Sequence, residues 1–271
     1  MQYSQKLFDD NKKLLYVWFS AMFTRVDVMI SADGSRDDLV KVAEQIKTEI
    51  ERVEAFANRF DENSELSHIN RNAHINEMRV SAELFSIIDE CQLYNKKTLG
   101  YFDITVNSTN GYKDGDANIY LDAEKHTIKF LHTDVRLDLS GFIKGYALRA
   151  VRNLLLNENI HNALINVGNS SILALGNHPC GKGWKISFPD TKTTNECVLN
   201  DECLTTSGNK EQTKWPILQP QTGRPIAKKQ DVSVITDDPA IGEVLSTALY
   251  VASDEEKALI LNQLKGKHIS C

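Results

Sequence analysis

The stretch Leu137-Asp-Leu-Ser-Gly-Phe-Ile-Lys-Gly-Tyr-Ala147 carries an acid, a base and two glycines at a predicted junction between a strand and a helix. Backbone N–H groups at the start of a helix lack partners within the helix, and the helix dipole is positive there. Lys144 adds a full positive charge beside them. The stretch is therefore compatible with a site for an anionic ligand such as phosphate, and equally with a plain turn whose glycines serve only the backbone.

Composition narrows the possible partners. The chain has 271 residues, of which 41% are hydrophobic and 25% charged, and its net charge is −6. These proportions are typical of a globular protein, and the negative charge argues against nucleic acid or an anionic membrane as the main partner. Five widely spaced cysteines without a CxxC pair indicate reduced thiols rather than disulfides or a zinc cluster.

We expect no signal peptide at the beginning of the sequence as given. Residues 1–13 are polar and lack the basic, apolar and small-residue regions of a signal peptide. The apolar run over 14–23 is about half the length of a membrane span, so we expect no transmembrane segment. The sequence as given predicts a cytoplasmic protein, or a periplasmic or cell-surface one if a leader has been removed.

Amphipathic segments with helical spacing alternate with short apolar runs, and this mixture predicts an α+β fold. Helices are expected over 37–57 with Asp37 near the N-cap, around 66–69, after Ser81, from the opening stretch to about 157, and over 241–251 and 255–264. Strands are expected over 14–30 (one or two), 99–106, 119–121, 127–131, 163–175 (a pair joined at Gly168), 184–188, 197–206 and 231–236.

Glu243 and Thr247 lie four residues apart on one predicted helix, with Ser246 beside them. A carboxylate and hydroxyls are ligands that Mg²⁺ accepts, with backbone carbonyls and phosphates completing its shell. The alternative is an ordinary amphipathic helix whose acid faces solvent.

Three other polar residues stand in positions that need an explanation. Lys144 could balance phosphates as a point charge, or be a solvated lysine. Asp103 and Asp138 interrupt apolar runs, where a carboxylate needs a hydrogen-bonding partner or a ligand; the alternative is that each caps a neighbouring turn.

Taken in chain order, eight motifs resemble the ApbE family of flavin transferases, which cleave FAD and attach FMN to a threonine of a target protein. The motifs are Met22-Phe-Thr24, Ser64–Asn70, Gly100–Val106, Asp138–Tyr146, Asn166–Gly168, Thr206–Gly208, Pro220–Pro225 and Leu245–Leu249. Each is weak alone, but together they span the chain from Met22 to about Val251 and keep the family's order.

The resemblance implies an α+β, T-fold-related core of antiparallel strands and helices with a smaller lobe, both in one domain over 1–271, and FAD in the cleft between. It implies the following FAD-site residues: Met22, Phe60, Tyr101, Phe102, Asp103, Asp138, Lys144 and Ile217. It implies Mg²⁺ held by the Gly141 backbone, Glu243, Thr247 and Ser246. Asp138 and Lys144 are the expected catalytic residues, and a flavin-acceptor protein is the expected partner.

Some positions depart from the family pattern. The family's His-Ile-Ile-Asp-Pro is Pro216-Ile-Leu-Gln-Pro220 here, so its histidine and aspartate are Pro216 and Gln219. Its metal-binding aspartate is Glu243, and the glycine of Met-Gly-Thr is Phe23. Two alternatives to the transferase therefore remain: a catalytically impaired FAD-binding protein of the same fold, and an FAD pyrophosphatase that releases AMP and FMN.

Overall fold

The computed structural model describes residues 1–7, 13–108, 118–189, 194–208, 217–226 and 231–269. Its main feature is one eight-stranded sheet in which every neighbouring pair is antiparallel. In spatial order the strands are β1 (Gln2–Leu7), β2 (Lys13–Ala21), β3 (Thr24–Ile30), β7 (Ala163–Val167), β8 (Ser171–Leu175), β11 (Cys203–Gly208), β14 (Asp231–Thr236) and β15 (Lys267–Ile269).

Three smaller sheets accompany it. One has the order β4 (Met78–Arg79), β6 (Thr127–Phe130) and β5 (Ile119–Asp122). The other two are hairpins, β9 (Trp184–Pro189) with β10 (Thr194–Leu199), and β12 (Leu218–Gln219) with β13 (Arg224–Pro225).

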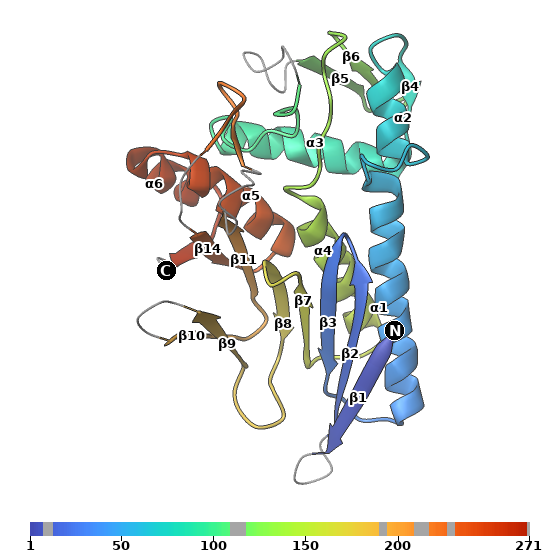
Figure 1. The fold of residues 1–271 in the computed structure, drawn as a ribbon, viewed down its shortest axis with the longest axis vertical. Helices are drawn as coiled ribbons and strands as arrows, with labels where there is room; N and C mark the ends of the chain where they lie inside the picture. Colours follow the sequence, from blue (N-terminus) through green and yellow to red (C-terminus); the bar gives the residue numbers. More distant parts are fainter. Residues whose placement is uncertain (8–12, 109–117, 190–193, 209–216, 227–230, 270–271) are drawn as a thin grey trace.

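Six helices complete the described part of the chain: α1 (Arg36–Ala57), α2 (Glu65–Asn72), α3 (Ala82–Lys97), α4 (Ile143–Asn157), α5 (Pro239–Val251) and α6 (Asp254–Gln263). Helices α1, α4 and α5 lie side by side and pack against the large sheet, α1 on β2, α4 on β8, and α5 on β11 and β14 (Figure 1). Helices α2 and α3 and the β4–β6–β5 sheet lie together beyond the end of α1. The predicted α+β class is confirmed.

Two large apolar clusters follow from this arrangement. One lies between the large sheet and the inner faces of α1 and α4, where apolar side chains recur at helical spacing, as in Leu39, Ile46 and Ile50. The other joins α3, α5 and the small sheet around Phe130, Phe142 and Tyr250. Part of α4 contributes to each cluster, so the helix that follows the opening stretch connects the two halves. Among the described residues no helix is both long and apolar enough to cross a membrane.

Asp37 lies in the first turn of α1, near the N-cap as predicted. The N-cap itself is Ser35, because the Ser35 hydroxyl accepts the Asp38 N–H at 3.2 Å while Asp38 Oδ2 accepts from the Ser35 backbone. This reciprocal capping box satisfies two otherwise free donors. Ser81 caps α3 as predicted.

The strand predicted over 99–106 is wrong: these residues form successive turns. Leu99 and Gly100 both have positive φ, 56° and 79°, which bends the chain sharply after α3. Side chains then satisfy the backbone locally, because Asn95 Nδ2 donates to the Phe102 carbonyl at 2.8 Å and Thr98 Oγ1 accepts the Phe102 N–H at 3.0 Å. Local bonds of this kind compete with a sheet ladder.

The opening stretch also differs from its prediction, because Leu137 to Leu139 belong to no sheet. The Asn70 side chain takes the place of a neighbouring strand, accepting from Leu137 N at 2.7 Å and donating to Leu137 O at 3.0 Å. Helix α4 starts at Ile143 and carries no capping side chain at Phe142. The strand predicted over 197–206 is two strands, β10 and β11, separated by a turn in which Asp201 has a φ of 55°.

Candidate functional site

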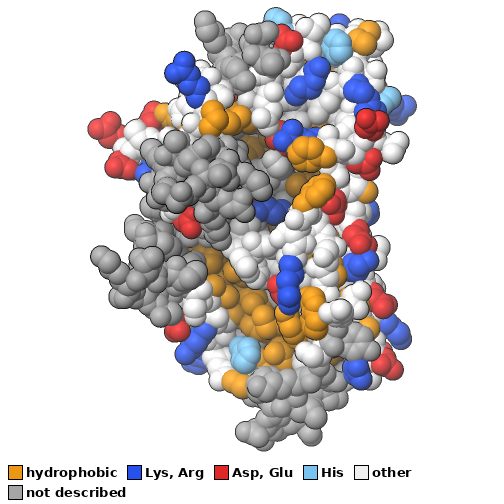
Figure 2. All heavy atoms as spheres, in the orientation of Figure 1, with side chains coloured by type: hydrophobic (Ala, Val, Ile, Leu, Met, Phe, Trp, Pro, Cys, Tyr) orange, Lys and Arg blue, Asp and Glu red, His pale blue; other side chains and the backbone are white. Residues whose placement is uncertain are grey.

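Two adjoining pockets open beside the start of α4, and they share Asp138, Ser140 and Lys144. The first, here the apolar pocket, is lined by Met22, Phe23, Glu54, Ala57, Asn58, Arg59, Phe60 and Ile143 in addition. The second, here the polar pocket, has these further lining residues: Tyr101, Phe102, Asp103, Val106, Asn107, Gly141, Ser170, Thr206, Ser207, Gly208, Ile217, Leu218, Pro220, Glu243 and Thr247. Figure 2 shows the hollow at mid-height, with basic and hydrophobic side chains at its rim.

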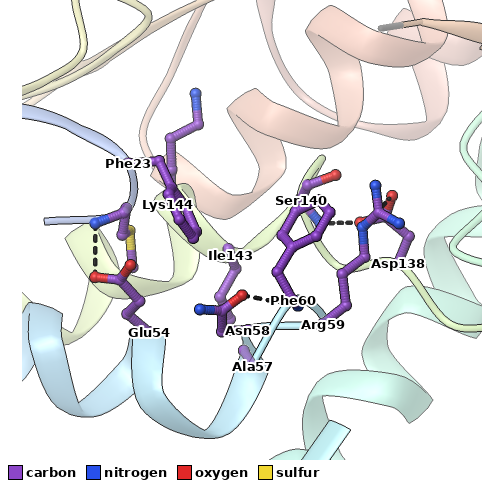
Figure 3. Close-up of a pocket in the computed structure, with 11 residues that line it drawn as sticks. Phe23, Glu54, Ala57, Asn58, Arg59, Phe60, Asp138, Ser140, Ile143 and Lys144 are labelled. Carbon is purple, nitrogen blue, oxygen red and sulfur yellow. Dashed lines mark hydrogen bonds and ion pairs between the residues drawn. The ribbon is translucent and has the colours of Figure 1, made fainter. Parts of the chain in front are cut away.

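The apolar pocket is built from the β2–β3 turn and the segment that follows α1. Met22 and Phe23 form the turn, and Glu54 on α1 holds it by accepting the Met22 N–H at 2.6 Å. The Arg59 guanidinium lies over the Phe60 ring, 4.2 Å from its centroid, in a cation–π contact. Ile143, the first residue of α4, lines the same pocket (Figure 3).

Asp138 lies where the two pockets meet, and its carboxylate has three donors. Arg59 Nε lies 3.2 Å from Oδ2, Asn107 Nδ2 donates to Oδ2 at 2.5 Å, and Ser140 N–H donates to Oδ1 at 2.9 Å. The side chain is only 8% exposed, and these three partners offset the free-energy cost of burying its charge. The Arg59 charge balances Asp138, which limits its repulsion of an anionic ligand.

Lys144, in the first turn of α4, points along the boundary between the pockets. Its Nζ donates to Ser170 Oγ at 2.6 Å, which connects α4 to the β7–β8 turn. Lys144 lies at the N-terminal end of α4, where the helix dipole is positive, an arrangement suited to phosphate.

Glu243 on α5 is buried, and its Oε1 accepts from the Ser171 hydroxyl. Burial raises the pKa of the Glu243 carboxyl, while nearby Lys144 and the Ser171 hydrogen bond act in the opposite direction. A carboxylate in this position gains from a cation placed in the polar pocket, which it lines.

One helical turn further, Thr247 lines the polar pocket opposite Gly141. A Cβ on Gly141 would lie 3.8 Å from Thr247 Oγ1, so backbone and hydroxyl approach closely. Ser207 Oγ lies 3.3 Å from Thr247 Oγ1 and 2.8 Å from Ser246 Oγ. Ser246 itself is fully buried behind the pocket wall, where it also donates to the Glu243 carbonyl at 3.2 Å.

The far end of the polar pocket comes from the turns after α3. Asp103 Oδ1 accepts from both the backbone N–H and the hydroxyl of Thr105, each at 2.7 Å, and burial raises the pKa of the Asp103 carboxyl. The Tyr101 hydroxyl donates to Glu256 on α6 at 2.7 Å, and burial together with this bond raises the pKa of Tyr101 to about 12.

The β12–β13 hairpin closes the polar pocket with Ile217, Leu218 and Pro220. Gln219 is turned to Gln221, to whose side-chain oxygen it donates at 2.7 Å. Pro216, which stands at the position of the family's histidine, lies outside the described residues.

The donors around Gly141 fit a hard cation. Glu243 offers a carboxylate, Thr247 and Ser207 offer hydroxyls, and the Gly141 backbone lies opposite. Within the described ranges no group of three or more His, Cys, Asp or Glu residues could hold a metal by itself. Phosphate oxygens of a bound molecule could complete the shell of a cation held here.

The structure brings the predicted site residues together: all except Ser246 line one of the two pockets. Residues that sequence reasoning missed are Arg59, Asn107, Ser170 and Ser171, which bind Asp138, Lys144 and Glu243. Arg59 directly precedes Phe60, and Ser170 lies two residues after the Asn166–Gly168 motif. Closeness in sequence to a predicted site residue or motif could therefore have indicated both. The motif Thr206–Gly208 is the C-terminal half of β11 and supplies all three of its residues to the polar pocket.

Comparison with known proteins places this architecture in a family. The model of the ApbE family matches residues 22–269, and the chain belongs to that family. An FAD:protein FMN transferase from Chlamydia muridarum is 28% identical over 81% of this chain and 78% of its own length. One from Haemophilus influenzae is also 28% identical, over 81% of this chain and 74% of its own length. The solved structure of the flavin transferase ApbE from Vibrio cholerae superimposes with a TM-score of 0.83 at 19% identity, covering 98% of this chain and 93% of that one.

Proposed function

We propose that this protein transfers FMN from FAD to a threonine or serine hydroxyl of a target protein, with Mg²⁺ as the metal. One observation carries the proposal: a pocket with aromatic walls and a pocket lined by hydroxyls, glycine and a carboxylate join at Asp138, Ser140 and Lys144. A dinucleotide has this form, with a ring system at each end and a pyrophosphate between them. Membership of a family whose relatives carry the name FAD:protein FMN transferase supports the same choice.

In this proposal the pyrophosphate of FAD lies beside the first turn of α4. Lys144 neutralises part of its charge. Ser170 Oγ holds the lysine in place by accepting a hydrogen bond from its Nζ at 2.6 Å. Asp138, held by Arg59 and Asn107, orients the ligand at the junction of the two pockets. These residues contribute by position and charge, which is the main requirement of phosphoryl transfer.

Glu243, Thr247 and the Gly141 backbone would hold Mg²⁺. Bound there, the ion would neutralise charge on the reacting phosphate and on the departing AMP. Glu243 is one methylene longer than the family's aspartate, and the Ser171 hydroxyl holds its carboxylate by donating to Oε1. Ser246, buried behind the wall, would support Ser207 and the α5 backbone rather than contact the ion.

The transfer itself is an exchange at phosphorus. The hydroxyl oxygen of the acceptor forms a bond to the FMN phosphorus and its proton is released to solvent. The bond from that phosphorus to the bridging oxygen breaks, and AMP leaves with that oxygen and the electron pair of the bond. When water takes the place of the hydroxyl, the same exchange hydrolyses FAD to FMN and AMP.

A second candidate, an FAD-binding protein that does not transfer, is favoured by one observation. At the position of the family's aspartate, Gln219 donates to Gln221 instead of lining the polar pocket. The two functions differ in whether the FAD pyrophosphate is cleaved.

The test is to incubate the purified protein with FAD, with and without MgCl₂, and to measure AMP by chromatography, both alone and with a threonine-bearing acceptor peptide. The transferase predicts Mg²⁺-dependent AMP that increases with the acceptor. AMP that does not depend on the acceptor would indicate a pyrophosphatase. No AMP, together with an FAD-dependent rise in the melting temperature, would overturn transfer and support the binding protein.

A further inference from the structure

The β2–β3 turn places an exposed phenylalanine at the mouth of the apolar pocket. Ala21 pairs with Thr24, so Met22 and Phe23 alone form the two-residue connection. Phe23 is 78% exposed, and Phe60, across the pocket, is 68% exposed. Solvent exposure of two neighbouring phenylalanines leaves apolar surface in water, which folding by itself does not favour.

The backbone at this turn is strained. Met22 has a φ of 52° and Phe23 a φ of 58°. A two-residue hairpin turn with positive φ at both positions strongly prefers Asn-Gly, Asp-Gly or Gly-Gly, because a Cβ is disfavoured in the left-handed region. Glu54 holds the turn in place through the Met22 N–H, at 2.6 Å. A bulky residue kept in such a conformation is a reason to look for a function at that position.

The two rings are oriented toward each other. Their centroids are 6.0 Å apart and their planes meet at 82°, an edge-to-face arrangement. Figure 3 shows the side chains approaching from separate elements, Phe23 from the β2–β3 turn and Phe60 from the segment after α1. The Arg59 guanidinium covers the Phe60 ring at 4.2 Å and so leaves Phe23 as the other accessible aromatic wall.

Resting on the proposed function, we infer that Phe23 is a specificity-determining residue that binds the isoalloxazine ring of FAD against the Phe60 side of the apolar pocket. Its apolar lining of Met22, Ala57 and Ile143 suits the dimethylbenzene edge of that ring. The Asn58 side chain accepts the Phe60 N–H through Oδ1 at 2.9 Å, which leaves its NH₂ group as a donor for the ring carbonyls.

The adenine ring of FAD is then expected in the polar pocket, whose lining suits its amino group. Asp103 offers a carboxylate that can accept from an amino group, and Tyr101 and Phe102 lie beside it. Phe23 therefore discriminates between the two halves of the substrate: it contacts flavins and does not contact adenine nucleotides.

The experiment compares Phe23→Gly, Phe23→Asn and Phe23→Tyr with the unaltered protein. Calorimetry gives the Kd for FAD, FMN and ADP, and thermal unfolding without ligand gives the melting temperature. Glycine and asparagine remove the ring and tolerate the positive φ, so neither should lower the melting temperature. We expect the Kd for FAD and FMN to rise roughly three- to tenfold in both variants while that for ADP stays unchanged. Phe23→Tyr, which keeps a ring, should keep the affinity for flavins.

Asn159→Gly is the matched control. Asn159 also has a positive φ, 56°, but it follows the far end of α4, about 20 Å from Ile143 at the helical rise per residue. It should leave all three Kd values unchanged. Unchanged FAD and FMN affinity in Phe23→Gly would overturn the inference, as would an equal loss of ADP affinity or a lowered melting temperature in both ring-removing variants. If the unaltered protein binds no FAD, the proposed function fails, and the inference fails with it.

Discussion

Gly145 and Glu243 lie in such close contact that a Cβ on Gly145 would be 2.7 Å from Glu243 Cγ. The same Cβ would be 2.3 Å from the Pro239 carbonyl oxygen, so the absence of a side chain lets α4 and α5 touch. This crossing brings Lys144, on α4, and Glu243, on α5, to the wall of one pocket. The glycine of the opening stretch thus has a packing role beside the chemical role of its neighbours.

Gly145→Ala should therefore separate α4 from α5. We expect a loss of about 1–3 kcal/mol in the free energy of unfolding, the usual cost of overpacking, and weaker FAD binding because Glu243 moves. Urea unfolding and calorimetry measure the two effects. Gly181→Ala is the control, since a Cβ there would meet nothing within 4 Å. A Gly145→Ala protein as stable as the control would contradict the packing role.

Lys144→Ala should weaken binding of every ligand that carries the pyrophosphate. We expect the Kd for FAD and ADP to rise roughly tenfold, the scale of one charge-assisted contact, and the Kd for riboflavin to stay the same. Lys125→Ala is a suitable control, because Lys125 is exposed and pairs only locally with Asp122. Equal losses for riboflavin and ADP would show that Lys144 supports the fold rather than the phosphates.

Glu243→Gln should remove the effect of Mg²⁺ on FAD affinity. The unaltered protein is expected to bind FAD more tightly in MgCl₂ than in EDTA, because the ion joins the carboxylate to the phosphates. Glutamine keeps the shape and loses the charge, so the two Kd values should become equal. Glu196→Gln, at an exposed position on β10, should keep the difference. A Mg²⁺ effect that persists in Glu243→Gln would show that the ion binds at other residues.

Asp103→Asn should change how stability depends on pH. Burial raises the pKa of the Asp103 carboxyl above its ordinary value of 3.8. Its stabilising contribution is therefore complete below pH 3.8 and is lost as pH rises through the higher folded pKa, because the buried carboxylate must ionise. The asparagine oxygen can still accept from Thr105. Without ligand, the melting temperature of Asp103→Asn minus that of the unaltered protein should increase with pH over this window. A constant difference would contradict the burial effect.

Much of the architecture could be predicted because it is local. Apolar spacing located α1, α4 and α5, and Ser81 marked the start of α3. Segments whose backbone is satisfied by distant or side-chain partners could not be predicted. The stretch around Leu137 looks like a strand but pairs with the Asn70 side chain, and Gly100–Val106 is held by Asn95 and Thr98.

The site shows the same division. The order of the motifs predicted site residues such as Lys144 and Thr247, and both line one pocket. Their partners were not, because Ser170 and Ser171 reach Lys144 and Glu243 only through the packing of β8 against α4 and α5. The strain at Phe23 is likewise a property of the turn's backbone and leaves no mark in composition.

The most direct measurement is the intact mass of a threonine-bearing acceptor after incubation with the protein, FAD and MgCl₂. Transfer predicts that the acceptor gains the mass of one FMN less one water, that AMP appears in equal amount, and that Lys144→Ala lowers both together. An acceptor of unchanged mass in the presence of bound FAD would contradict the proposed transfer, whether or not AMP is released.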